Sequence, residues 1–247
     1  MNIKWQIRAW ALLGVASAVL IAGGTTSLAQ DSTPASDGAI GSAAEICGQV
    51  SIATPAQGVI DQSMPTMEEF DLLFIDLMVS HHQGAVAMAI VAQERAQHPE
   101  IRQLAGEIIA AQQPEIDQMN GWRAAWYPGA PVLPEAQAMN AFDRMTSSMP
   151  GMGGMPGASE MMMGSMHDLQ TLCAASPEAF DLIFLDGMIA HHQSAIMMAQ
   201  SALNHATHDE IKTLATAIIV AQQKEIDAML AWRAAWYPDA TPVTTQG

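Results

Sequence analysis

The sequence predicts an all-α protein, a four-helix bundle made from two tandemly duplicated helical hairpins. The main observation is a repeat: FDLLFIDLMVSHHQ, which begins at Phe70, returns as FDLIFLDGMIAHHQ at Phe180, an offset of 110 residues. No stretch alternates between apolar and polar residues with the period of two that is typical of strands. A lone hairpin cannot bury its apolar face, whereas two hairpins can bury theirs against each other.

The chain begins with a segment, residues 1–29, that has the pattern of a signal peptide. Lys4 and Arg8 precede an apolar run, and Ser27-Leu28-Ala29 places small residues where a signal peptidase cleaves. We therefore expect a soluble, exported (periplasmic or secreted) protein. An uncleaved N-terminal membrane anchor is the alternative, although the apolar run is short for a secure span. Residues 30–62, rich in Ser, Ala, Gly and Thr, are expected to be a mostly disordered lead-in.

Each repeat is expected to be one helical hairpin, over residues 63–128 and 176–238. In the first repeat, we expect helix one to end near Gln93 and helix two to start near Pro99. Helix two should end at Tyr-Pro, because proline cannot continue a helix. The second hairpin repeats these features 110 residues later.

The linker between the hairpins, residues 129–175, is rich in Met, Gly and Pro, and a short tail follows at 239–247. Gly and Pro at this density prevent a regular core helix, so the linker is expected to expose its thioethers. Thioether is a durable soft ligand outside the cytoplasm, where cysteine clusters oxidise, and it suits Cu(I) and Ag(I). A low-complexity spacer is the alternative. The candidate ligands here are Met149, Met152, Met155, Met161, Met162 and Met163.

The chain has two cysteines, Cys47 and Cys173, each upstream of one repeat. In an oxidising compartment such a pair is most simply a disulfide. A pair of soft metal ligands is the alternative.

The charge balance narrows the classes of partner. The formal net charge is −16, from 9 basic and 25 acidic residues. Phosphate backbones require basic patches, so the composition argues against nucleic acid as a partner. An acidic surface attracts cations at long range.

The duplicated histidine pairs are the principal candidate site. Met78, His81 and His82 share one side of a helix by their spacing. With a hairpin turn near residues 96–97, Gln112 and Glu115 come level with them. The second repeat supplies the equivalent set of Met188, His191, His192, Gln222 and Glu225.

Imidazoles and thioethers at one depth suit copper, since thioether prefers Cu(I) and imidazole accepts both oxidation states. The alternative is a set of buried histidines whose nitrogens are satisfied by Gln or Glu across the core. Met88, Met119, Met198 and Met229 fit core packing better than ligation. For His98 and His208, which occur at the two hairpin turns, a ligand role and a solvated turn residue remain open.

At these residues the chain resembles the bacterial domain of unknown function 305 family, with a copy over Phe70–Pro128 and another over Phe180–Pro238. The pattern is Met-Ile-x-His-His-Gln, then His-x-Glu-Ile, then Gln-x-x-Glu-Ile-x-x-Met-x-x-Trp. The resemblance implies an exported ferritin-like bundle, in a family with some copper-binding members. The ligands that it implies are Met78, His81, His82, Met88 and His98, with Met188, His191, His192, Met198 and His208.

The expected function is therefore copper sequestration or hand-over rather than enzymatic catalysis. A ferritin-like di-iron oxidase is an alternative, but such sites ordinarily need Glu-x-x-His, which this sequence lacks. The second alternative is a metal-free helical module that binds another protein or the cell envelope. A copper-handling protein partner and a homo-oligomer both remain open.

Overall fold

The described part of the chain is all helical. The computed structural model describes residues 41–50, 67–133, 137–142 and 168–241, and no strand occurs within these ranges. The long helices are α2 (Met67–Arg95), α3 (Pro99–Trp126), α6 (Pro177–His205) and α7 (Asp209–Trp236), preceded by the short α1 (Ala43–Val50). The predicted all-α bundle is confirmed. The predicted signal peptide lies outside the described residues.

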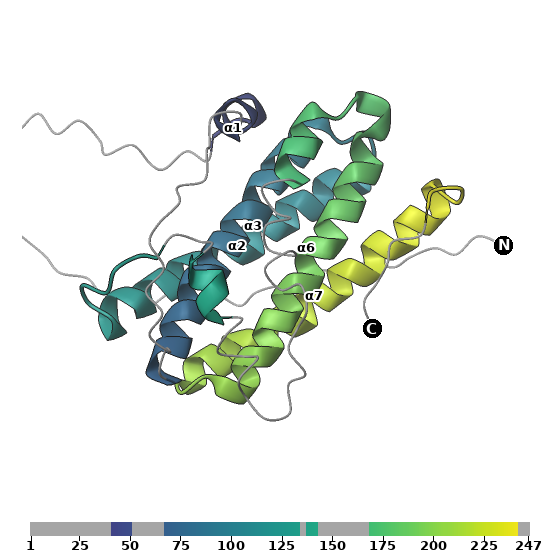
Figure 1. Cartoon of the computed structure of the whole chain (residues 1–247). Helices are drawn as coiled ribbons and strands as arrows, with labels where there is room; N and C mark the ends of the chain where they lie inside the picture. Colours follow the sequence, from purple (N-terminus) through teal and green to yellow (C-terminus); the bar gives the residue numbers. More distant parts are fainter. Residues whose placement is uncertain (1–40, 51–66, 134–136, 143–167, 242–247) are drawn as a thin grey trace, which may run out of the picture. The chain divides into compact units, whose positions relative to one another are not determined.

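The four long helices form two hairpins, α2–α3 and α6–α7, drawn in blue to teal and in green to yellow in Figure 1. Helices α2 and α6 also pack against each other and bring the two hairpins together. Phe70, Phe74, Phe180 and Phe184 are fully buried in the resulting core. Burial of each such ring stabilises a fold by roughly 1.5–3 kcal/mol.

Helix α2 is long and apolar enough over Phe70–Arg95 to resemble a membrane span. Of its most apolar window, 67% is buried inside the structure. Its composition therefore fits the innermost helix of a bundle, whose apolar residues face protein on several sides.

The turn of each hairpin is held by an aspartate from the other hairpin. In the first turn, the backbone N–H groups of Gln97 and His98 each donate to a carboxylate oxygen of Asp181 at 2.9 Å. The ring Nδ1 of His98 lies 2.6 Å from the same carboxylate. Asp181 is thereby buried without leaving its charge unpaired.

The second turn repeats this arrangement with Asp71. The backbone N–H groups of Thr207 and His208 donate to its carboxylate, as does the hydroxyl of Thr207. The ring Nδ1 of His208 lies 2.6 Å from it. Because each hairpin closes the turn of the other, the two depend on each other for a complete fold.

The ends of α3 and α7 cover these turns with aromatic rings. The His98 ring stacks on Trp236 at 3.8 Å between centroids, and the His208 ring stacks on Trp126 at 3.9 Å. The end of the second helix of each hairpin therefore covers the turn of the other hairpin.

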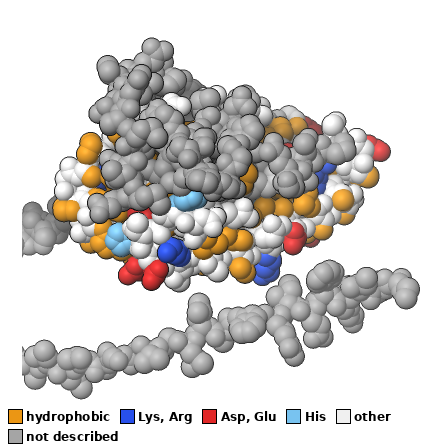
Figure 2. Space-filling view, turned by 60° about the horizontal axis from the view of Figure 1, so that its bottom comes forward, with side chains coloured by type: hydrophobic (Ala, Val, Ile, Leu, Met, Phe, Trp, Pro, Cys, Tyr) orange, Lys and Arg blue, Asp and Glu red, His pale blue; other side chains and the backbone are white. Residues whose placement is uncertain are grey.

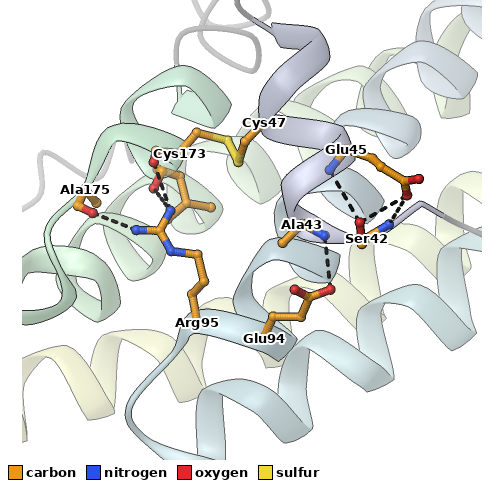
Figure 3. The surroundings of a disulfide bond; sticks show 9 residues. Ser42, Ala43, Glu45, Cys47, Glu94, Arg95, Cys173 and Ala175 are labelled. Carbon is orange, nitrogen blue, oxygen red and sulfur yellow. Dashed lines mark hydrogen bonds between the residues drawn. A yellow bond between two sulfur atoms is a disulfide. The ribbon is translucent and has the colours of Figure 1, made fainter.

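A disulfide joins Cys47 of α1 to Cys173, as predicted, across a sequence separation of 126 residues (Figure 3). Beside it, the Arg95 guanidinium donates to the carbonyl oxygens of Leu172, Cys173 and Ala175. The backbone N–H of Ala43 donates to Glu94 at 3.0 Å. These bonds attach two segments that precede the hairpins to the end of α2.

The structure differs here from the sequence-based expectation. Helix α1 falls within the lead-in expected to be mostly disordered, and helical segments occur at 137–142 and 168–174 within the linker. Each has a reason in packing: α1 is tied by the disulfide, and Phe142 and Leu172 are buried against the core. The remainder of the lead-in, and the Met-rich residues 143–167, lie outside the described residues.

The surface is consistent with the acidic composition. In the face shown in Figure 2, the described Lys and Arg side chains lie singly among acidic, apolar and uncharged groups. That face offers no broad basic patch within its described area.

Candidate metal centre

His81 and His82 occupy the middle of α2, and His191 and His192 occupy the middle of α6. Consecutive residues of an α-helix point about 100° apart, so the two rings of each pair face different neighbours. His81 faces α6, whereas His82 faces α3. All four side chains are buried, at 2% exposure or less.

The outer ring of each pair is bonded to a glutamate. His82 Nε2 lies 2.8 Å from Glu115 Oε2, and His192 Nε2 lies 2.6 Å from Glu225 Oε2. The predicted depth match between the histidine pair and Glu115 is therefore confirmed. An ionised carboxylate only accepts hydrogen bonds, so Nε2 of each ring carries a proton, and in the neutral form of the ring Nδ1 carries the lone pair.

The inner rings, His81 and His191, lie against each other with centroids 3.7 Å apart and planes tilted by 41°. His81 Nε2 is 2.6 Å from the hydroxyl oxygen of Ser194. Burial lowers the pKa of both rings well below the usual value, and the other histidines of the centre lower it further. Both imidazoles are thus neutral at neutral pH, the state in which a histidine binds a metal ion.

The centre contains buried polar atoms that have no hydrogen-bond partner. Such atoms are rare in native cores because each costs roughly 1–3 kcal/mol, and they call for a ligand or an ordered water. A satisfied structural histidine would not show this pattern. Among the described residues, the unpartnered buried atoms are Nδ1 of His81, His82, His191 and His192, Nε2 of His191, and Oε1 of Gln112 and Gln222.

The donor chemistry fits a metal ion. Histidine ligands usually donate their other ring N–H to a carboxylate, a carbonyl or water, which orients the ring and raises its basicity. Glu115 and Glu225 stand in that position. In His81, His82 and His192 the hydrogen bond at Nε2 thus leaves Nδ1 as the nitrogen that can bind a metal ion.

The described residues contain no ready-made group of three His, Cys, Asp or Glu side chains around one point. The contact between the rings of His81 and His191 explains part of this, because an ion held by both rings requires space between them. The four histidines are therefore buried imidazole donors that do not close around one point in the described part of the chain.

The remaining candidate ligands occupy other places. Met78 and Met188 are fully buried one helical turn before the histidines. Met78 shares a core cluster with Met198, and Met188 shares another with Met88, so thioethers are buried in both of these clusters.

His98 and His208 lie at the hairpin turns, bonded to Asp181 and Asp71. Helix α2 continues from His81 to Arg95, about 20 Å, before the first turn begins. The structure thus does not bring the turn histidines to the central group. The Met-rich candidates Met149, Met152, Met155, Met161, Met162 and Met163 lie outside the described residues.

Two kinds of residue were missed by sequence reasoning. Asp71 and Asp181 recur at the offset of 110, which could have marked them, but their partners lie on the opposite hairpin. Ser194 gave no signal of this kind, because the equivalent position holds Gly84.

The fold and the centre place the chain among known relatives. The model of the domain of unknown function DUF305 matches residues 71–233 in one match that covers both hairpins. The chain belongs to the DUF305 family.

Solved structures support this membership. CopM in its Cu(I)-bound form is 33% identical, covers 68% of this chain and 97% of its own, and has a TM-score of 0.51. CopM in its Ag-bound form gives the same values. A DUF305 protein of Streptomyces coelicolor, inferred to be secreted, is 25% identical over 67% of this chain and 93% of its own, with a TM-score of 0.54.

A curated relative matches a shorter stretch. An uncharacterised protein of Acanthamoeba polyphaga mimivirus is 47% identical over 49 residues, which is 20% of this chain. The match spans about a third of that relative's length, 32%.

Proposed function

We propose that this protein binds copper at the central histidine group and sequesters or hands on the metal. The observation that carries the proposal is the set of buried, unpartnered imidazole nitrogens. Neutral imidazole accepts both Cu(I) and Cu(II). CopM, which is 32–33% identical to this chain, is known in Cu(I)-bound and Cu(II)-bound forms, which supports the choice of metal.

The Met-rich linker is proposed as a second, softer site. Its six candidate thioethers suit Cu(I) and Ag(I). The Ag-bound form of CopM, which is 33% identical to this chain, supports a soft metal. A linker site would capture metal outside the bundle, and the histidines would then hold it away from water.

The setting proposed for this activity is outside the cytoplasm. The signal-peptide pattern of residues 1–29 and the secreted relative from Streptomyces coelicolor support export. The Cys47–Cys173 disulfide supports an oxidising compartment. Within this proposal the chain holds two tandem copies of a hairpin in a ferritin-like bundle, and it passes copper to a partner protein or acts as a homo-oligomer.

The di-iron alternative receives less support from the geometry. Each hairpin brings one glutamate to the histidines, and that glutamate is occupied by the ring N–H of His82 or His192. Carboxylate-bridged iron sites need more carboxylates than this. Copper therefore remains the favoured metal.

The test is a Cu(I) titration of the protein against a competing chelator. We would compare the wild type with a variant in which all four central histidines are Gln, and with a deletion of residues 145–167. Binding should fall in two separate steps, one for each change. His205→Gln is the control for the loss of an imidazole, because His205 bonds the backbone of its own helix.

Tight binding by the wild type that is lost in the four-histidine variant would support the central site. Binding that is the same in the wild type and the four-histidine variant would overturn it. Thermal unfolding of each variant shows whether a loss of copper is a loss of fold.

A further inference from the structure

The two inner histidines are equivalent in sequence but have different neighbours. His81 and His191 are related by the offset of 110 residues, and their rings are in contact. Three residues after His191 stands Ser194, whereas three residues after His81 stands Gly84. A serine hydroxyl is thus available to the ring of His81, whereas the equivalent position for the ring of His191 is a glycine with no hydroxyl.

The hydrogen bonds of Ser194 determine where His81 carries its proton. The hydroxyl donates to the carbonyl oxygen of His191 at 2.7 Å, and the same oxygen lies 2.6 Å from His81 Nε2. A hydroxyl has a single proton to donate, and a carbonyl oxygen has none, so the proton between these two groups belongs to the hydroxyl. The serine oxygen must therefore accept the Nε2–H of His81.

The opposite assignment fails on geometry. If the Ser194 hydroxyl donated to His81 Nε2, its oxygen and the carbonyl oxygen of His191 would lie 2.7 Å apart with no hydrogen between them. Two acceptor oxygens at that distance repel each other. The assignment with the proton on Nε2 satisfies both contacts.

This bond makes the two rings unequal as donors. His81 presents the lone pair of Nδ1, an atom that is buried and has no partner. Neither nitrogen of His191 makes a hydrogen bond of normal geometry. The backbone of His81 is the smallest of the influences on the pKa of this ring, so no strong hydrogen bond selects which nitrogen carries the proton. Gly84, at the position equivalent to Ser194, has no side chain with which to make such a bond.

We propose that Ser194 is a positioning residue that makes His81 the preorganised Nδ1 ligand of the copper centre, with His191 as the weaker, unfixed ligand. This inference rests on the proposed function. Outer partners of this kind commonly contribute 10–100-fold to metal affinity, because they fix the tautomer and orientation of the ring. Loss of His81 should therefore weaken copper binding at least tenfold more than loss of His191.

The near-symmetry of the hairpins supplies a reciprocal test. We would measure Cu(I) affinity by chelator competition for His81→Gln and for His191→Gln, first in the wild type and then in the double swap Gly84→Ser/Ser194→Gly. In the wild type the His81 variant should bind more weakly. In the swap, where the hydroxyl serves the other ring, the order should reverse.

A second measurement needs no metal. Nitrogen-15 NMR of the histidine rings in the metal-free protein reports which nitrogen bears the proton. His81 should be in the Nε2–H form in the wild type and should become a mixture of forms in Ser194→Ala. Alanine keeps the helix stable, so a change in tautomer is separate from unfolding.

The outcomes distinguish the two levels of the proposal. Equal losses for His81→Gln and His191→Gln in the wild type would overturn the role of Ser194 while leaving the copper site. A wild-type His81 protonated at Nδ1 would overturn that role as well. Copper binding unaffected by either histidine variant would overturn the central copper site itself.

Discussion

At each end of the bundle, an aspartate of one hairpin binds the turn of the other hairpin, an arrangement that we call a clasp. The two clasps differ in the residues that cover them. At one end Asp181 holds the turn at Gln97 and His98, and at the other Asp71 holds the turn at Thr207 and His208. Each clasped histidine stacks on a tryptophan. The duplicated residues therefore make the same contacts at both ends.

The coverings combine segments outside the repeated stretches with repeat positions at which the two hairpins carry different residues. At the Asp181 end, Arg95 binds three carbonyl oxygens of residues 172–175, and the disulfide adds α1. At the Asp71 end, His205 replaces Arg95 in sequence, and the Phe70 ring packs between His205 and Phe142. The covering of the Asp181 end is thus held by a disulfide and hydrogen bonds, whereas the covering of the Asp71 end is held by contacts between rings.

The largest expected difference between the ends comes from the disulfide. Replacing both Cys47 and Cys173 by Ser should lower the free energy of unfolding by about 3–5 kcal/mol, because the bond closes a long loop in the unfolded chain. Urea unfolding of the oxidised wild type and the variant measures this. Reduced wild type should match the variant. A loss below about 1 kcal/mol would show that the covering at this end depends on Arg95 instead.

The clasps should be nearly equal in strength, with the Asp71 clasp somewhat stronger. Asp71→Ala and Asp181→Ala should each cost about 3 kcal/mol, since each leaves several buried donors unpaired. Asp71 also accepts the Thr207 hydroxyl, and Gln97 at the equivalent position makes no such bond to Asp181, so Asp71→Ala should cost about 1 kcal/mol more. Urea unfolding of the two variants checks the order. A greater loss for Asp181→Ala would contradict it.

The centre between the two ends should make stability depend on pH. Burial lowers the pKa of His81 and His191 below the value of 6.5 in the unfolded chain. The unfolded state then binds protons that the folded state does not, so stability is constant above that value and falls as the pH drops below it.

Between pH 7.5 and 5.5 the metal-free protein should lose roughly 2–3 kcal/mol through these two rings. Urea unfolding at both pH values measures the loss, and the double variant His81→Gln/His191→Gln should lose correspondingly less. An equal loss in the variant would assign the pH dependence to other groups.

The smallest expected effect tests whether two equivalent positions on the second helices of the hairpins respond alike to substitution. Gly121 in α3 corresponds to Ala231 in α7 at the offset of 110. A methyl group at Gly121 would meet no atom within 4 Å. Gly121→Ala should therefore stabilise the fold by about 0.5–1 kcal/mol, and Ala231→Gly should destabilise it by a similar amount. Thermal unfolding of both variants checks the pair, and an unchanged stability in either would contradict the equivalence.

Much of this architecture follows from local sequence. The hairpins, the second-helix starts at Pro99 and Asp209, and the contact between His82 and Glu115 follow from helical spacing and a turn near residues 96–97. These are contacts within one hairpin, where sequence distance translates directly into height along the helix.

Contacts between the hairpins could not be obtained in the same way. The bond from His81 to Ser194 and the clasp of Asp71 on Thr207 depend on how α2 and α6 pack, which spacing along one helix does not define. Helix α1 was also missed, because its place depends on a cysteine 126 residues away.

Because each hairpin closes the turn of the other, the two hairpins of one chain can differ in sequence in ways that two identical subunits cannot. A single hairpin would satisfy its turn by pairing with a second copy around a two-fold axis, and every residue would then occur twice in identical surroundings. Joining two hairpins in one polypeptide removes that restriction. This chain carries serine at position 194 and glycine at position 84, a combination that no homodimer of identical hairpins can hold. With both hairpins in one chain, the interior can differ between the two sides while the contacts at the two turns stay alike.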